Sequence, residues 1–218
     1  MMSSSRTPPW THAAARTALL AAALIGAASS PFAQEVDGEA VYKYCESCHG
    51  KRGAGREQGK YPRIAGLPRP YVDKQLHDFK AKRRVNKPMI PIFKHHRFDD
   101  QVIGAVAGHI AALPVPDLAL WPYEPDPGAL SVFPSRAVFD DAGAGKYADA
   151  CSGCHGERGG GVAAHGTPPL THQYPAYLRK QIADFASGRR SHVHSDRCAG
   201  LTAAEADAVI AHLVELGK

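Results

Sequence analysis

Two amphipathic segments, each present twice, dominate the pattern of apolar and polar positions along the chain. The first has apolar residues at i, i+4 and i+7, a spacing that places them on one face of a helix. These residues are Val72, Leu76 and Phe79 in one copy, and Leu178, Ile182 and Phe185 in the other. The second has apolar residues at i, i+3, i+7 and i+10. These are Ile103, Val106, Ile110 and Leu113, then Ala206, Val209, Leu213 and Leu216. The pattern predicts two halves, each with a middle and a terminal helix.

The distance between the two copies changes along the chain. Arg83-Arg84 recurs 106 residues later as Arg189-Arg190, whereas the two terminal helices are offset by 103 residues. The second half has therefore lost three residues between Arg190 and its last helix. An internal repeat of this length predicts two small domains in place of one medium-sized domain.

Each half begins with the same motif. The two copies read Cys45-Glu46-Ser47-Cys48-His49-Gly50 and Cys151-Ser152-Gly153-Cys154-His155-Gly156. CxxCH attaches c-type haem, because two thiols at this spacing can form thioethers with the vinyl groups while the His binds the iron. A CxxC pair can instead be a redox dithiol, and four cysteines can bind zinc, but neither explains the His and Gly that follow both pairs.

The motifs therefore predict two covalently bound haem c groups. Their attachment residues are Cys45, Cys48, Cys151 and Cys154. His49 and His155 are the expected proximal ligands of the two irons.

The N-terminal residues 1–33 have the features of a secretory signal peptide. Arg6 and Arg16 precede an apolar run from residue 17 to 28, and small residues follow up to Ala33. The run is shorter than the roughly 20 apolar residues that a membrane span requires, although an uncleaved anchor is an alternative. We expect cleavage near Ala33 and a periplasmic location. Peripheral association with a membrane remains open.

The charge balance argues against nucleic-acid binding. Removal of residues 1–33 takes away two of the 26 Lys and Arg residues and none of the 21 Asp and Glu residues, which leaves 24 against 21. Haem propionates would lower this small excess further, so we expect no nucleic-acid partner.

Prolines separate the two halves. They are Pro114, Pro116, Pro122, Pro125, Pro127 and Pro134. We expect them to interrupt regular structure from about 114 to 137 and to form a stiff, extended connector. The expected domains are then residues 34–113 and 138–218, with 114–137 as the linker. Trp121 and Tyr123 should attach this linker to a domain.

The two halves resemble class I cytochrome c domains, and their tandem order is similar to the two-haem cytochrome c4 family. The match rests on both CxxCHG motifs, on YPRIAGLPRPYVDKQLHDFKAKRRVNKPM in the first half and on YPAYLRKQIADFASGRR in the second. The resemblance implies an all-α fold of two tandem cytochrome c-type haem domains joined by a proline-rich linker. It also implies haems that lie close across an interface and a function in electron transfer.

In this family a methionine between the middle and terminal helices is the sixth ligand of the iron. Met89 occupies that place in the first half, and a role in core packing is the alternative. Because Met1 and Met2 would leave with the signal peptide, the second haem cannot have a methionine of its own.

The candidates for the second haem are His192, His194 and Cys198. In the related domains the methionine lies seven residues before the Leu that opens the last helix, and counting back from Leu201 gives His194. We therefore expect bis-His coordination by His155 and His194, with His192 as the second choice and Cys198 as the third. The alternatives for Cys198 are a small packing residue and a redox-active thiol.

Unlike ligands should give the haems unlike potentials, because methionine opposite His raises the potential of an iron and a second imidazole generally leaves it lower. Electrons would then enter at the second haem and leave through the Met89 haem. Basic residues near Met89 could steer docking with an acidic redox partner or could form a solvated loop. They are Lys80, Lys82, Arg83, Arg84, Lys87, Lys94 and Arg97.

Two functions follow. The favoured one is a periplasmic carrier of single electrons from a dehydrogenase or quinol-oxidising complex to a terminal oxidase or reductase. The alternative is a small dihaem oxidoreductase that acts on an inorganic sulfur anion, by similarity to thiosulfate dehydrogenases, which also have one unusually ligated haem. Cys198 and the basic loops support that alternative, so an enzymatic role stays open. A peroxidase would need an open iron and a longer chain.

Overall fold

The described part of the chain is built from helices and loops. A computed structural model describes residues 35–120, 122–192 and 200–218. Within these ranges there is no strand, and two isolated bridges join Arg56 to Tyr61 and Val162 to Thr167. The expected all-α fold is confirmed.

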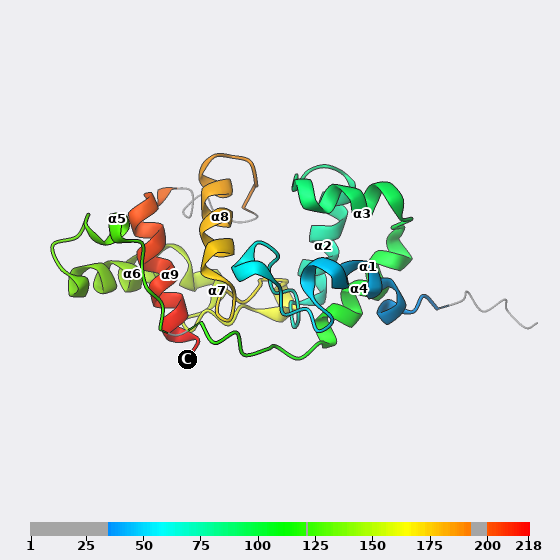
Figure 1. Cartoon of the computed structure of the whole chain (residues 1–218), viewed down its shortest axis with the longest axis horizontal. Helices are drawn as coiled ribbons and strands as arrows, with labels where there is room; N and C mark the ends of the chain where they lie inside the picture. Colours follow the sequence, from blue (N-terminus) through cyan, green and yellow to red (C-terminus); the bar gives the residue numbers. More distant parts are fainter. Residues whose placement is uncertain (1–34, 121, 193–199) are drawn as a thin grey trace, which may run out of the picture. The chain divides into compact units, whose positions relative to one another are not determined.

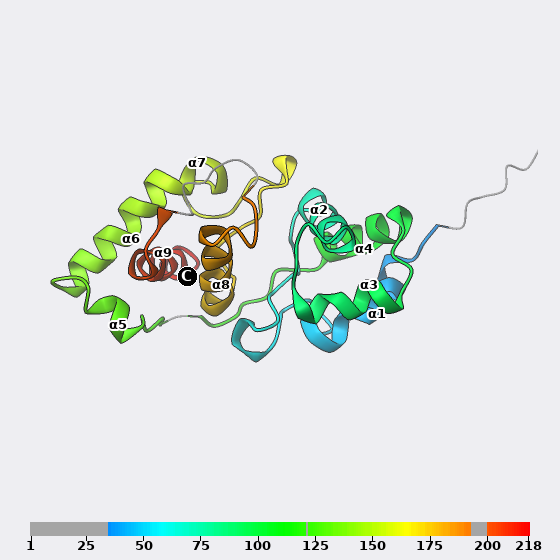
Figure 2. The same ribbon diagram turned by 90° about the horizontal axis from the view of Figure 1, so that it is seen from above.

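The first half contains four helices, which lie together in Figures 1 and 2. They are α1 (Gly38–His49), α2 (Arg69–Lys80), α3 (Ile90–His95) and α4 (Asp100–Ala112). The second half contains α5 (Pro127–Leu130), α6 (Arg136–Ala150), α7 (Ser152–His155), α8 (Pro175–Ala186) and α9 (Ala203–Leu216). Short 3₁₀ turns are η1 (Glu57–Gly59), η2 (Lys87–Met89) and η3 (Ala163–His165).

The helices predicted from the apolar pattern are present in both halves as α2, α4, α8 and α9. The two terminal helices begin at equivalent side-chain caps. The Asp99 carboxylate accepts a hydrogen bond from the backbone N–H of Val102 at 3.0 Å. The Thr202 hydroxyl accepts one from Glu205 at 3.2 Å. The caps differ by 103 residues, as the apolar faces do, so the structure confirms that the second half is shorter by three residues before its last helix.

Glycines allow the first and last helices of each half to cross closely. A Cβ atom on Gly38 of α1 would lie 2.3 Å from the carbonyl oxygen of Ala105 in α4. A Cβ atom on Gly143 of α6 would lie 2.2 Å from the carbonyl oxygen of Ala208 in α9. Neither gap can hold a methyl group, so a glycine is needed at both contacts. Helix α1 therefore packs on α4 in the same close way as α6 packs on α9.

Each half buries its own apolar cluster under these crossings. The first cluster contains Val41, Tyr42, Leu67, Val72, Leu76, Phe98, Ile103, Val106, Ala107 and Ile110. The second contains Tyr147, Cys151, Leu178, Val209, Ile210 and Leu213, and Phe139, Ala208 and Ala211 form a further cluster of the same half. The predicted apolar faces of the four helices therefore serve packing.

The linker contains one element that the prolines were expected to prevent. Helix α5 begins at Pro127, and α6 begins at Arg136. Proline is tolerated in the first helical turn, where its missing N–H has no partner to lose, and the Asp126 side chain accepts hydrogen bonds from Gly128 and Ala129. The expectation that the prolines interrupt all regular structure from 114 to 137 was therefore wrong for this turn.

Tyr123 attaches the linker to the second half, as predicted. Its hydroxyl donates a hydrogen bond of 2.7 Å to Asp207 of α9, and the backbone N–H of Asp126 donates one of 2.8 Å to the same carboxylate. Asp207 is 1% exposed and is also paired with Arg179. Burial and the neighbouring Asp207 carboxylate raise the pKa of Tyr123 to about 12. Trp121, the other predicted attachment, lies outside the described residues, and so does the expected signal peptide.

Every helix within the described ranges is too short or too polar to cross a bilayer.

Candidate haem sites

The two CxxCH motifs lie at the same place in each half, at the end of the first long helix. Cys45, Cys48 and His49 are in the last turns of α1, whereas Cys151 is the cap residue between α6 and the one-turn α7, which carries Cys154 and His155. The next residue is a glycine with positive φ in both halves, 78° at Gly50 and 80° at Gly156. The chain can therefore turn away directly after each His.

A buried tyrosine fixes each of these turns. The hydroxyl of Tyr42 donates a hydrogen bond of 2.7 Å to the carbonyl oxygen of Gly50. Tyr147 does the same to Gly156 at 2.5 Å. Both tyrosines belong to the apolar cores, at 1% and 2% exposure. Each motif is thus anchored to its own half.

Backbone hydrogen bonds orient the two histidines. Nδ1 of His49 lies 2.9 Å from the carbonyl oxygen of Pro62, and Nδ1 of His155 lies 2.9 Å from that of Pro168. A carbonyl only accepts, so Nδ1 must carry the proton and Nε2 is left with its lone pair. Burial lowers the pKa of both imidazoles, although the bond to the carbonyl opposes this. A neutral imidazole with its orientation set by the other nitrogen is the form that binds a metal.

A cavity of about 560 Å³ connects the motifs of both halves. Its lining includes Cys45, Cys48, His49, Met89, Cys151, Cys154, His155 and His192. The remaining lining is largely apolar and comes from the cores of both halves, as expected for a flat hydrophobic cofactor. Two thiols and one oriented imidazole on each side fit two covalently attached haem groups.

The structure describes some of the expected sixth ligands. Met89 is half-buried in η2, packs against the first core and lines the cavity. His192 is half-buried and lines the cavity on the side of the second half. His194 and Cys198 lie outside the described residues, so the expected pair of His155 and His194 stays a prediction.

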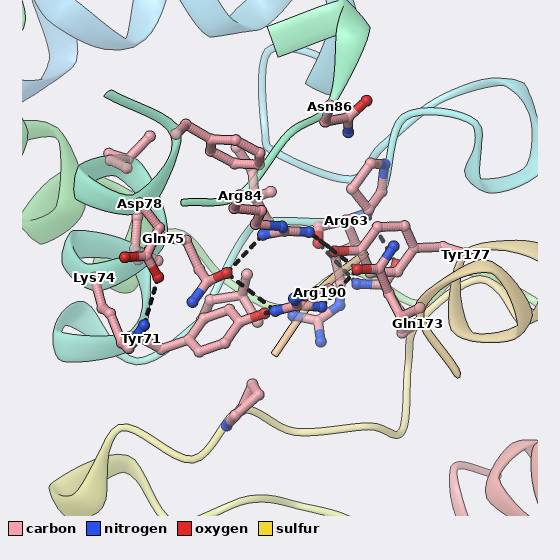
Figure 3. Close-up of a pocket in the computed structure, with 18 of the residues that line it drawn as sticks. Arg63, Tyr71, Lys74, Gln75, Asp78, Arg84, Asn86, Gln173, Tyr177 and Arg190 are labelled. Atoms are coloured by element: carbon pink, nitrogen blue, oxygen red, sulfur yellow. Dashed lines mark hydrogen bonds and ion pairs between the residues drawn. The ribbon is translucent and has the colours of Figure 1, made fainter. Parts of the chain in front are cut away.

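Arg84 crosses from the first half to the second (Figure 3). Its guanidinium donates hydrogen bonds of 2.7 Å to Gln75 in its own half, and of 3.0 and 3.1 Å to Tyr177 and Gln181 of α8. The backbone N–H of Arg84 donates to Asp78, which fixes the turn after α2. Arg84 was expected in the basic surface near Met89, but its side chain points into the interface between the halves.

Arg190 makes the reciprocal set of contacts. It donates hydrogen bonds to Gln181 in its own half at 2.5 Å, and to Tyr71 and Gln75 of α2 at 3.0 Å each. Burial alone would raise the pKa of Tyr71, but the charges of Arg190 and Arg84 outweigh it and lower that pKa. Gln75 and Gln181 each accept from both arginines. The repeat therefore forms an approximately symmetric bridge between the halves.

Arg63 adds a contact that has no counterpart in the repeat, because Pro169 stands at the equivalent position. Its side chain is fully buried, and its Nε donates a hydrogen bond of 2.5 Å to the carbonyl oxygen of His172. Gln173 accepts from the backbone N–H of Arg63 at 3.1 Å and donates to its carbonyl oxygen at 2.9 Å. Burial lowers the pKa of Arg63 to about 10. The difference between Pro62-Arg63 and Pro168-Pro169 was the sequence signal for this contact.

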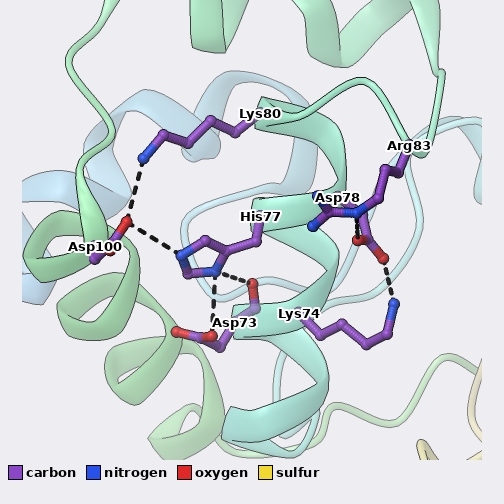
Figure 4. A network of polar contacts seen from close by, with 7 residues as sticks. All are labelled: Asp73, Lys74, His77, Asp78, Lys80, Arg83 and Asp100. Carbon is purple, nitrogen blue, oxygen red and sulfur yellow. Dashed lines mark hydrogen bonds and ion pairs between the residues drawn. The ribbon is translucent and has the colours of Figure 1, made fainter.

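Carboxylates neutralise part of the basic surface near Met89 (Figure 4). Asp78 pairs with Lys74 and with Arg83, and these partners lower its pKa even though burial opposes the shift. Lys80 and His77 both contact Asp100 at the start of α4. The exposed cations that remain are Lys82, Lys87, Lys94 and Arg97. The two roles expected for the basic surface were docking with an acidic partner and a solvated loop. Either role is therefore limited to these four residues.

Comparison with known proteins agrees with this geometry. The cytochrome c family model matches residues 35–113 and 141–217. The chain is 31% identical over 185 residues to a thiosulfate dehydrogenase electron acceptor of Stutzerimonas stutzeri, covering 80% of this chain and 82% of that one. It is 29% identical to cytochrome c4 of Pseudomonas aeruginosa over 71% and 72% of the two chains. The crystal structure of reduced cytochrome c4 from Pseudomonas stutzeri has the same fold, with a TM-score of 0.63, 24% identity and coverage of 81% and 95%.

Two tandem haem domains with a shared cavity define a dihaem c-type cytochrome. The chain belongs to the cytochrome c family, in its cytochrome c4-like group. It carries two covalent haem c groups, on Cys45 with Cys48 and on Cys151 with Cys154, and it transfers electrons between redox proteins.

Proposed function

We propose that His49 and Met89 bind the iron of the first haem, and that His155 binds the iron of the second on its proximal side. The hydrogen bonds from Nδ1 of the two histidines to backbone carbonyls support this assignment, because they leave Nε2 as the metal-binding atom. Met89 supports it by its half-buried place at the wall of the same cavity. When bound, each haem supplies a one-electron redox centre.

The proposed function is to take single electrons from a donor enzyme and deliver them to a terminal oxidase or reductase. The continuous cavity lined by both CxxCH motifs is the observation that carries it, because two redox centres in one enclosure can exchange an electron within the molecule. We propose that electrons enter at the second haem, whose ligand set lacks methionine, and leave through the Met89 haem, which has the higher potential.

The proposed donor is a dehydrogenase that oxidises an inorganic sulfur anion. Two relatives are named as electron acceptors of thiosulfate dehydrogenase, at 31% and 30% identity. In this proposal the chain accepts the electrons that the dehydrogenase removes from the sulfur anion. The alternative is that this chain oxidises the anion itself. The exposed cations Lys82, Lys87, Lys94 and Arg97 would steer docking with an acidic partner.

We propose that the chain is exported to the periplasm and cleaved near Ala33. The leader-like residues 1–33 and the covalent attachment of haem support this location.

The test is to mix the oxidised holoprotein with thiosulfate, with and without a purified thiosulfate dehydrogenase, and to follow haem reduction by visible absorption. We expect reduction only with the enzyme present, at a rate that falls as salt is added. Reduction with thiosulfate alone, and sustained turnover when an excess of an artificial electron acceptor is added to that mixture, would instead make this chain the enzyme. No reduction in either mixture would reject a sulfur-oxidising donor.

A further inference from the structure

We propose that His192 is the sixth ligand of the second haem, on the face opposite His155. Both imidazole rings line the cavity, their centroids lie 6.3 Å apart, and their planes are tilted by 52°. An imidazole nitrogen binds a metal at about 2 Å and its ring centre lies about 1 Å further away, so two axial imidazoles on one iron are about 6 Å apart. The observed separation thus leaves room for one metal ion between the rings.

The orientation of His155 agrees with this arrangement. Its Nδ1–H donates to the carbonyl oxygen of Pro168, so the Nε2 atom at the other end of the ring is available to the cavity that His192 also lines.

The register of the chain gives the same residue independently. The caps Asp99 and Thr202 show that α4 and α9 begin with an offset of 103 residues, and we apply the same offset to the segments that precede them. Met89 lies nine residues before Phe98, and His192 lies nine residues before the equivalent Leu201. Phe98 packs in the first core and Leu201 against the second, so the two landmarks occupy matching places.

This register differs from the spacing that is typical of the related domains. The interval of seven residues that is typical of the related domains points to His194 when it is counted back from Leu201. The first half of this chain uses nine residues between Met89 and Phe98, and the same interval in the second half ends at His192. The three missing residues then fall directly after Arg190, in the segment that joins α8 to the ligand.

The surroundings of His192 hold its ring in place. Phe185 of α8 meets it edge-to-face, with ring centroids 5.0 Å apart and an angle of 87°. The guanidinium of Arg190 lies over the ring of Phe185, 4.8 Å from its centroid. Arg190 is itself held by its hydrogen bonds to Tyr71 and Gln181. A ligand positioned by an aromatic wall and a bridged arginine is preorganised toward the cavity.

The test uses the oxidised full-length holoprotein and low-temperature electron paramagnetic resonance, with visible spectra alongside. The wild type should show two low-spin irons in equal amounts, one with His/Met and one with bis-His ligands. In His192→Ala the bis-His signal should disappear in favour of high-spin iron, and added free imidazole should restore a bis-imidazole signal. The matched variant His194→Ala should keep both wild-type signals.

A second variant guards against loss of folding. His192→Met supplies a different strong ligand at the same place, and it should double the sulfur-to-iron charge-transfer absorption because both haems become His/Met. Survival of the bis-His signal in His192→Ala, its loss in His194→Ala, or a thiolate-type signal in the wild type would each overturn the proposal. These readouts need no donor enzyme, so they are independent of whether the sulfur-oxidising partner is correct.

Discussion

Met89 is the proposed sixth ligand of the first haem, and the other two methionines of the sequence, Met1 and Met2, lie in the expected signal peptide. We expect Met89→Leu to change the first haem alone. The substitution nearly conserves volume and should cost less than about 1.5 kcal/mol in packing. The iron would lose its thioether, so its His/Met signal should give way to high-spin iron and its potential should fall. Paramagnetic resonance and a redox titration would measure both effects.

Ile92→Leu is the matched control for this change. Ile92 is half-buried against the same core as Met89 and has no ligand atom. Its substitution should leave both haem spectra as in the wild type. An intact His/Met signal in Met89→Leu would show that Met89 is a packing residue.

At the scale of single residues, the sequence was sufficient where chemistry is confined to a short motif. The thiols and imidazole of CxxCH lie within five residues, so their joint function is visible without the fold. The contacts of Arg63 with His172 and Gln173 join residues about 110 positions apart, so the difference from Pro169 could single out Arg63 but could not identify its partners. The acceptor role of Gln75 was missed for the same reason, although its recurrence as Gln181 was visible.

At the scale of the helices, the close packing of α6 on α9 can be tested by substitution. Gly143→Ala would place a methyl group 2.2 Å from the Ala208 carbonyl oxygen, so the helices must separate. We expect a loss of about 1–3 kcal/mol in the free energy of unfolding, as for other overpacked sites. Urea unfolding of the holoprotein, followed by circular dichroism, would measure it.

Gly145→Ala, on the same helix, should have the opposite effect. Gly145 is exposed, and a Cβ atom there meets nothing within 4 Å. Alanine is the better helix former by up to about 1 kcal/mol, so this variant should be as stable as the wild type or more stable. Equal destabilisation by both substitutions would show that the close approach of Gly143 to Ala208 does not determine the result.

The middle and terminal helices of each half could be predicted because their apolar faces repeat at helical spacing and occur twice. The short elements could not be predicted in this way. Helix α5 depends on one side-chain cap, Asp126, next to a proline that also signals a break. The 3₁₀ turn that carries Met89 has three residues, too few for any periodicity. The site therefore lies partly on elements that leave no mark in the apolar pattern.

For the whole molecule, the repeat does more than supply two copies of one site. Turn η1 of the first half contacts α8 of the second, and η3 of the second half contacts α2 of the first. Arg84 and Arg190 donate to the same two glutamines from opposite sides. Because every one of these contacts occurs twice with the halves exchanged, duplication of one domain created both partners of the interface.

The strength of this bridge can be measured by exchanging neighbouring arginines for alanine. Arg84→Ala removes three hydrogen bonds, two of which join the halves, and should lower the free energy of unfolding by about 2 kcal/mol, the order expected for charged donors. Arg83→Ala removes an ion pair with Asp78 whose arginine side chain is 63% exposed, and should cost less than about 1 kcal/mol. Urea unfolding of both holoproteins gives the comparison.

In Arg84→Ala the two haems should also become less dependent on each other in a redox titration, because the halves are held together more weakly. Equal effects of the two substitutions would place the stabilising contribution in the total charge of this turn, and the reciprocal arginine bridge would then have no special part in joining the halves.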